Sequence, residues 1–351
     1  MRLNSKKWNN GNLELSPVPM KRARATHRER VDAPVERVFA LLPPLFASRG
    51  GETHWLTTHR DDEQHRYGAV LLRPELAIGK LEVELSTSEG TTEVALELAY
   101  TAITGAGNQL FDDDLDHRMT QLLTHIVAAL RGNAVSADEL RLPGAGPSAA
   151  AGDAFESATA GAEHEMVVRA DPDECFALAC PVAELDWIDG WQFDLTYSDS
   201  GKNEDDCIFL EPASGLAVHR TVGANTTWYT TLYDTESRRF HAVLLTRDFV
   251  IGRWSLEVDD LGAGRSRFRW SLTYSGLNEQ GNRIIRENGF EQRVLNMERF
   301  LALSAKRYLE TGEIERLPAR RKAEIAISLL GATVARHFCR PQRDSAATPE
   351  R

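Results

Sequence analysis

Hydrophobic and polar residues alternate along several short segments in the second half of this 351-residue chain. In RFRWSLTY (267–274) every second residue is aromatic or aliphatic, and the residues between them are Arg, Ser and Thr. Neighbouring side chains of a strand point to opposite faces, so this pattern predicts an antiparallel sheet with one dry face and one wet face. Turn residues separate it from similar segments, which are FDLTYS, DCIFLEP, TTWYTTLYD, RRFHAVLLT and RWSLEVDD.

Apolar residues at alternating spacings of four and three predict a long helix from about Asn282 to Glu310. A shorter helix precedes the sheet, with Asp171 as its N-cap and Pro172 at its first position. The first half of the chain has a matching apolar stripe, so we expect a helix there as well. The two stripes are Phe290, Val294, Met297, Leu301, Ser304 and Tyr308, and Leu115, Met119, Leu122, Ile126 and Ala129.

The chain contains an internal repeat. The segment WLTTHRDDEQHRYGAVLLRPELAIG, from Trp55, matches WYTTLYDTESRRFHAVLLTRDFVIG, from Trp228, at 12 of 25 positions with an offset of 173. Unrelated segments of average composition share roughly one or two such positions. Farther upstream the offset is 137, because VDAPVERVFALLPP, from Val31, aligns with VRADPDECFALACP, from Val168. The difference, 173 − 137 = 36, means that the first copy lacks about 36 residues between Pro181 and Trp228.

An Ala-, Gly- and Ser-rich stretch separates the copies and is typical of a flexible linker. We therefore expect a shortened first domain at 20–133, a linker at 134–162, a complete second domain at 163–312 and a helical tail at 313–351. The tail carries an apolar side between basic ends, which predicts docking on a domain or a homodimer contact. The shortened first copy is the other candidate surface for a homodimer.

The net charge of −11 argues against a nucleic-acid partner, because phosphate binding relies on clustered Lys and Arg. The four cysteines show no spacing typical of a metal site, so we expect reduced, buried thiols, no metal and no cofactor. The N-terminus lacks a secretory signal, and the longest apolar run, 325–335, is too short to span a bilayer. A cytoplasmic location is the corresponding expectation.

Three segments together resemble the START/Bet v 1-like superfamily and, more narrowly, bacterial SRPBCC proteins, which include polyketide cyclases and dehydrases. They are APVERVFALL (33–42), CPVAELDWIDGW (180–191) and TYSGLNEQGN (273–282). The resemblance implies an α+β helix-grip fold, in which a curved antiparallel sheet wraps a long C-terminal helix and leaves a cavity. Here the fold would be duplicated, and CPVAELDWIDGW would help to form one end of the second cavity.

Aromatic and apolar residues of the second domain are the candidate ligand-binding residues, although the tryptophans suit core packing equally well. His241 shares a strand face with Val243 and Leu245, which suggests that it points into the cavity. It is a weak catalytic candidate together with Tyr229 and Asp186; for Asp186, helix capping or exposure to solvent is the simpler interpretation. The ligand-binding candidates are Trp187, Trp191, Trp228, His241, Val243, Trp254, Trp270, Tyr274, Phe290, Val294, Met297 and Leu301.

The leading functional hypothesis is binding of a hydrophobic small molecule, such as a lipid, a polyketide or an aromatic compound, in the second domain. An aromatase/cyclase-type enzyme acting on a polyketide is the second hypothesis, and a protein-interaction module is the third. The shape of the cavity separates the three. Convergent polar groups in an enclosed pocket favour the enzyme, a purely apolar pocket favours the carrier, and a filled core favours interaction.

Overall fold

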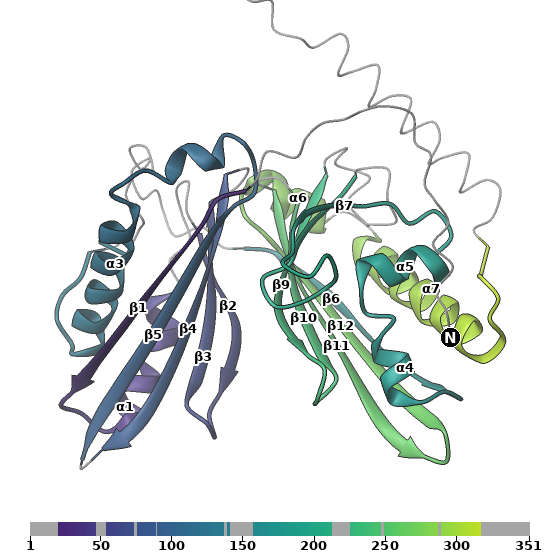
Figure 1. Ribbon diagram of the computed structural model, residues 1–351, viewed down its shortest axis with the longest axis horizontal. Coiled ribbons are helices and arrows are strands. Elements are labelled where there is room, and N and C mark those ends of the chain that lie inside the picture. Colours follow the sequence, from purple (N-terminus) through teal and green to yellow (C-terminus); the bar gives the residue numbers. More distant parts are fainter. Residues whose placement is uncertain are drawn as a thin grey trace, which may run out of the picture.

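The computed structural model describes residues 20–46, 54–73, 76–88, 90–136, 139–140, 157–212, 225–246, 249–286 and 289–316. They form two antiparallel sheets, one in each half of the chain (Figure 1). The first sheet has the strand order β1-β5-β4-β3-β2, and the second has the order β6-β12-β11-β10-β9-β8-β7. In both sheets the first strand of the copy pairs with the last. The linker segment 141–156 and the tail helix expected beyond residue 316 lie outside the described residues.

The first copy consists of five strands and three short or medium helices, followed by its closing helix. Its elements are β1 (Arg22–Val31), α1 (Val35–Ala40), α2 (Leu42–Leu45), β2 (His54–Asp61), β3 (Arg66–Arg73), β4 (Ala77–Ser88), β5 (Thr91–Ala102), the 3₁₀ helix η1 (Gly107–Leu110) and α3 (Leu115–Leu130).

The second copy repeats this order with additional elements. It contains β6 (Thr159–Val168), α4 (Pro172–Phe176), α5 (Pro181–Trp187), β7 (Asp194–Tyr197), β8 (Ile208–Glu211), β9 (Thr226–Asp234), β10 (Arg239–Thr246), β11 (Val250–Gly262), β12 (Arg265–Gly276), α6 (Glu279–Arg286) and α7 (Phe290–Thr311). The segment predicted to be missing from the first copy supplies α5, β7 and β8, which explains why the second sheet is two strands wider.

Each copy has the helix-grip architecture. Helix α7 packs on β6 at one edge of the second sheet, and α3 packs on β1 and β5 in the first. The predicted N-cap is present: the Asp171 carboxylate accepts a hydrogen bond from the Asp173 backbone N–H at 2.9 Å. The single helix predicted from Asn282 is instead two helices, because Gly289 has a left-handed backbone (φ 87°) that ends the continuous helical geometry just before Phe290.

The two sheets pack against each other, and the helices α3 and α7 lie on the outside of this pair (Figure 1). The shared apolar cluster brings Val70, Leu72 and Ile78 of the first copy together with residues of β8, β9, β10 and β11. At its margin the Asp206 carboxylate accepts a hydrogen bond from Tyr229 at 2.7 Å and pairs with Arg22 of the first copy. The part of β10 that carries Val243 and Leu245 is therefore covered by the first sheet, whereas β12 keeps the predicted wet face.

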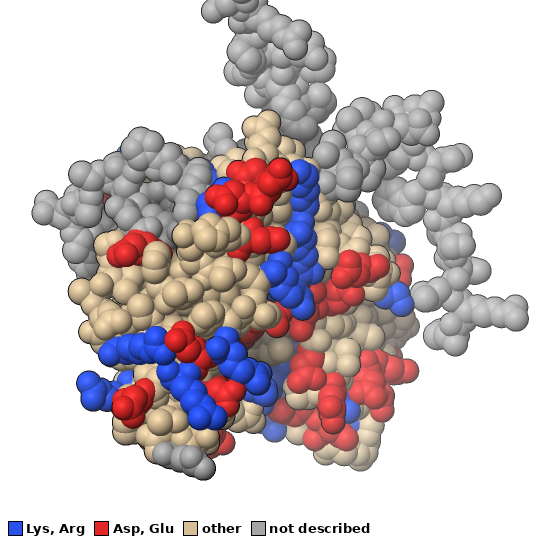
Figure 2. All heavy atoms as spheres, turned by 60° about the vertical axis from the view of Figure 1, so that its left-hand side comes forward, with Lys and Arg blue, Asp and Glu red and all other residues tan. Residues whose placement is uncertain are grey.

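Charged side chains of both signs are interspersed on the face of the molecule in Figure 2, with no large basic surface. Within the part of the chain that the structure describes, no helix has the length and apolar character to cross a membrane. Three of the four cysteines are described, and Cys175, Cys180 and Cys207 are free and buried.

Candidate functional site

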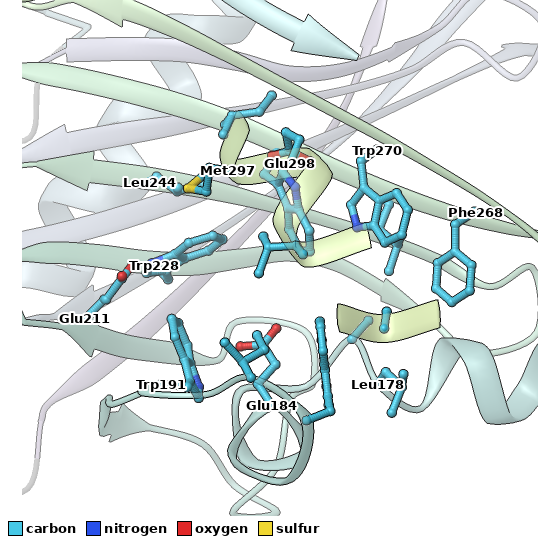
Figure 3. A pocket seen from close by; sticks show the side chains of 18 of the residues that line it. Leu178, Glu184, Trp191, Glu211, Trp228, Leu244, Phe268, Trp270, Met297 and Glu298 are labelled. Carbon is cyan, nitrogen blue, oxygen red and sulfur yellow. Dashed lines mark hydrogen bonds between the residues drawn. The ribbon is translucent and has the colours of Figure 1, made fainter. Parts of the chain in front are cut away.

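A hollow lies between the second sheet, α5 and α7 (Figure 3). Its cavity volume is about 50 Å³. Its walls are mostly apolar and aromatic, and they include Trp187, Trp191, Trp228, Trp254 and Trp270. The indole rings narrow the space between sheet and helix but do not fill it.

The segment unique to the second copy builds one wall. Helix α5 presents Glu184 and Trp187 to the hollow, and Trp191 follows the helix. The indole N–H of Trp191 donates a hydrogen bond to the Pro181 carbonyl at 2.9 Å. Strand β8 contributes Glu211, which accepts a hydrogen bond from Trp228 Nε1 at 3.1 Å. Without this segment, the first copy cannot close a hollow in the same way.

Small residues of the second copy also make room for the hollow. Ala179 and Ala305 line it and are almost fully buried. At the offset of 137 found upstream, Ala179 aligns with Leu42. The closing helices align at an offset of 175, which pairs Ala305 with Leu130; both leucines are buried in the first core. Two leucines of the first copy are thus replaced by alanines in the second.

Glu298 is the most unusual residue of the site. It comes from the middle of α7, its exposed fraction is 0%, and neither carboxyl oxygen accepts a hydrogen bond of ordinary length and angle, although the indole N–H of Trp254 lies near them. Burial raises the pKa of Glu298 to about 8, an effect that the neighbouring Trp254 partly offsets. At neutral pH this side chain is therefore mainly a neutral acid. At the offset of 175 its counterpart in the first copy is the fully buried Leu123.

Two further carboxyl groups border the hollow. Glu184 points from α5 toward its open centre, and Glu211 lies beside Trp228 (Figure 3). Burial, with repulsion from Glu211 added, raises the pKa of Glu184 to about 8. Burial also raises the pKa of Tyr274 well above its usual value, and the nearby Glu211 and Glu298 contribute to this rise. Three acids thus converge on one aromatic hollow.

The predicted site residues divide into two groups. Eight of them line the hollow; their role in binding a ligand stays a prediction. These eight are Trp187, Trp191, Trp228, Trp254, Trp270, Tyr274, Met297 and Leu301.

His241 and Val243 do not line the hollow, which corrects the predicted orientation of β10. Phe240, Ala242 and Leu244 face the helix side, whereas Val243 belongs to the cluster shared with the first copy. His241 borders a separate polar space between the copies, beside Thr58. Both faces of β10 are buried, one under α7 and one under the first sheet, so alternation alone did not identify the cavity face.

The remaining candidates also lie elsewhere. Tyr229 belongs to the cluster between the two sheets, where its hydroxyl binds Asp206. Asp186 is exposed on α5, as its simpler interpretation predicts. Phe290 and Val294 pack in the core of the second copy, outside the hollow, because they lie on the first turns of α7.

Glu298 and Glu211 were missed in the sequence, although each leaves a signal there. Phe290, Val294, Glu298 and Ala302 are spaced by four residues and form one buried row of α7, so a carboxyl group interrupts an apolar row. In β8, Glu211 lies two residues after Phe209, so the two side chains are on the same face of the strand. A charged residue at a core position of a periodic element is the common signal.

The site has two chemical capacities. Indole faces of this kind can stack on flat apolar molecules or attract cations. Its neutral carboxyl groups donate a proton or a hydrogen bond, and in their ionised form they accept one. Among the described residues that line the hollow, none is Lys, Arg or His, so the polar character of the site is entirely acidic apart from indole and phenol groups.

No protein-family model matches the chain, and no curated protein matches its sequence. Several solved structures resemble it. Norcoclaurine synthase from Thalictrum flavum has 15% identity and a TM-score of 0.34, over 45% of this chain and 91% of the other. The di-domain ARO/CYC protein StfQ of the steffimycin biosynthetic pathway has 15% identity and a TM-score of 0.33, over 82% and 98%.

A START superfamily protein from Mycobacterium smegmatis has 9% identity and a TM-score of 0.33, over 44% of this chain and 99% of the other. Likenesses at these TM-scores decide nothing about function. The helix-grip fold and its duplication, which the resemblance to START-like proteins implies, are confirmed by the strand order and closing helix of each copy.

Proposed function

We propose that the second domain binds an apolar or aromatic small molecule in the hollow between its sheet and α7. The observation that carries the proposal is the set of paired positions at which the second copy has Ala179 and Ala305 and the first has leucine. An empty space costs packing energy, about 24 cal/mol per Å³ of cavity. A ligand that fills the space recovers this energy.

The wall composition indicates the class of ligand. Binding sites for small molecules are mostly apolar with a few polar groups that fix orientation, and this hollow has five indoles and three carboxyl groups. Flat rings stack on indole faces better than flexible alkyl chains do. Among lipids, polyketides and aromatic compounds, ring-containing compounds are therefore the best fit.

Native mass spectrometry of the full chain purified from its own host tests this proposal. We expect a mass excess of one small molecule in the wild-type protein and its loss in Ala305→Leu, which restores the residue of the first copy. Arg299→Leu is the matched control, because it adds a leucine on the exposed side of the same helix. An adduct that persists in Ala305→Leu, or a protein free of any adduct that also binds no aromatic probe, would contradict the proposal.

The convergence of Glu184, Glu211 and Glu298 favours a second candidate, an aromatase/cyclase-type enzyme. A carboxyl group with a pKa of about 8 is protonated at neutral pH and suits general-acid catalysis of a dehydration. In that step the acid protonates a departing hydroxyl group, water leaves, and loss of an α-proton forms the double bond.

A probe for this activity is 4-hydroxy-4-phenylbutan-2-one, which loses water to give an enone with strong absorption. The enzyme hypothesis predicts accelerated enone formation that falls in Glu298→Gln and Glu184→Gln and is unchanged in Glu291→Gln, an exposed position of α7. Equal rates in all four proteins would remove the enzyme hypothesis and leave binding.

Location in the cytoplasm and homodimer formation through the first domain or the tail stay predictions. The protein-interaction hypothesis requires a filled core in the second copy, and the hollow gives it no support. Size-exclusion chromatography with light scattering distinguishes a monomer from a dimer directly.

A further inference from the structure

We infer that the ligand of the second-domain hollow carries a cationic amine, which the carboxyl groups of Glu298, Glu184 and Glu211 receive while the indoles hold its apolar body. This inference rests on the proposed function and narrows it to one class of compound. It begins with Glu298, whose two carboxyl oxygens are buried at the edge of an open space and accept no hydrogen bond of ordinary length and angle, with only the indole N–H of Trp254 near them.

A buried polar group without a partner is destabilising, and proteins seldom retain one without a reason. Packing of α7 does not require the carboxyl group, because the first copy has Leu123 at the matching buried position of α3. The acid at 298 is therefore unexplained by the fold. A donor group on the ligand is the partner that the structure leaves room for.

The charge of that donor follows from the surroundings. Three carboxyl groups border the hollow, and none of its described lining residues is basic, so an anionic ligand meets repulsion from any ionised acid. A neutral hydroxyl group satisfies one oxygen of one acid. A protonated amine has up to three N–H donors and lets more than one carboxyl group ionise.

The aromatic walls act in the same direction. Indole faces attract cations, by about 0.5–2 kcal/mol in general and most strongly where water is excluded. Trp228 and Trp254 pack edge to face, with ring centroids 5.7 Å apart, beside the acids at 211 and 298. This hollow places carboxyl groups next to indole faces and is closed by apolar residues. Such a combination is expected to bind an organic cation with a ring or a short apolar chain.

The number of protons released on binding distinguishes a cationic ligand from one that only packs in the hollow. Glu298 and Glu184 are mainly neutral at pH 7 in the free protein, since burial holds the pKa of each at about 8. A bound ammonium group favours the ionised form, so binding of an amine releases protons to the solution. A neutral ligand of the same shape releases none.

The experiment is isothermal titration of the full-length chain at pH 7 with 2-phenylethylamine, 2-phenylethanol and 3-phenylpropionate, in two buffers of different ionisation enthalpy. Indole serves as an uncharged aromatic probe. We expect the amine to bind about tenfold more tightly than the alcohol, with the carboxylate weakest and proton release seen only with the amine. Glu298→Gln should reduce the preference for the amine and the proton release, whereas Glu291→Gln should leave both unchanged.

The possible outcomes separate the inference from the proposed function. If the alcohol or indole binds as tightly as the amine, or if Glu298→Gln keeps the preference, the cationic ligand is wrong and the binding site stands. If no probe binds, indole included, the proposed function is wrong and the inference with it. If Ala305→Leu binds the amine as well as the wild-type protein does, the amine occupies another site, and the inference is again wrong.

Discussion

The two copies of the fold place different residues at the same core positions. At matched sites the first copy has Leu42, Leu81, Leu96, Leu123 and Leu130, all buried, and the second has Ala179, Trp254, Trp270, Glu298 and Ala305. At these five positions the first copy has leucine throughout, which suits close packing. The second set combines small, aromatic and acidic side chains and surrounds a hollow.

The two copies also differ in how each face of the sheet is covered. The first copy packs its sheet on the outer face of the second sheet and supplies apolar cover there. The second copy, supported on that face, tolerates a hollow and an unpartnered acid on the other. We propose that the first domain is a structural partner and that the second domain is the functional one.

The largest expected effect comes from placing the acid of the second copy in the core of the first. Leu123→Glu buries a carboxyl group among the apolar residues of the first core, so we expect a loss of about 4 kcal/mol in the free energy of unfolding. Urea denaturation of the full chain measures this loss. A loss below about 1 kcal/mol would show that the two cores are more alike than described.

The reverse substitution, Glu298→Leu, should stabilise the second copy by about 3 kcal/mol at pH 7, because it removes the cost of neutralising a buried acid. The folded-state pKa of about 8 lies above the ordinary value of 4.5. Below pH 4.5 the carboxyl group is neutral in both the folded and the unfolded chain, so it costs no stability. As the pH rises from 4.5 toward 8, the unfolded chain ionises while the folded chain does not, and stability is lost.

Unfolding curves of the wild-type protein and Glu298→Leu, recorded from pH 4.5 to 8, test that sign. The advantage of the variant should be small at pH 4.5 and should grow toward pH 8. A difference that does not depend on pH would mean that Glu298 is ionised throughout. Arg299→Leu provides the control for an added leucine on α7.

The shared face between the sheets predicts an intermediate effect. Leu245 is 2% exposed within the cluster that joins the copies, and Leu245→Ala should lower the free energy of unfolding by about 2–3 kcal/mol. Leu303→Ala, at an exposed leucine of α7, should change it by less than about 0.5 kcal/mol. Equal effects of the two substitutions in thermal denaturation would indicate that the copies do not pack in solution as described.

The smallest predicted effect concerns the start of α4. Asp171→Ala removes the side-chain acceptor of the Asp173 N–H and should cost about 1 kcal/mol. The first copy has Pro34 as the N-cap of α1, without a side-chain hydrogen bond, so Pro34→Ala should lack this cap penalty. Denaturant midpoints of both variants, compared with the wild-type protein, measure the difference.

Much of the fold was predictable, because repeats, alternation and caps are local signals in the sequence. The offset change of 36 residues located the segment that forms α5, β7 and β8, and the apolar stripes located α3 and α7. The break before Phe290 was not predicted, because a glycine within a periodic segment does not by itself end a helix.

The site was less predictable, because burial by a distant segment changes what a pattern means. His241 and Val243 lie on a face that is apolar only because the first copy covers it, so their alternation gave the wrong side. Glu298 was passed over because helices usually carry charges on solvent faces. Its place in a row with Phe290 and Val294 was the available signal.

The most direct test of the account is the stoichiometry of indole binding to the full chain, measured by calorimetry with the wild-type protein and with Ala179→Leu/Ala305→Leu. We expect one indole per wild-type chain and none for the double variant, because the hollow found among the described residues lies in the second copy and the two leucines fill it. Two indoles per chain, or unchanged binding by the double variant, would contradict the assignment of the site to the second copy.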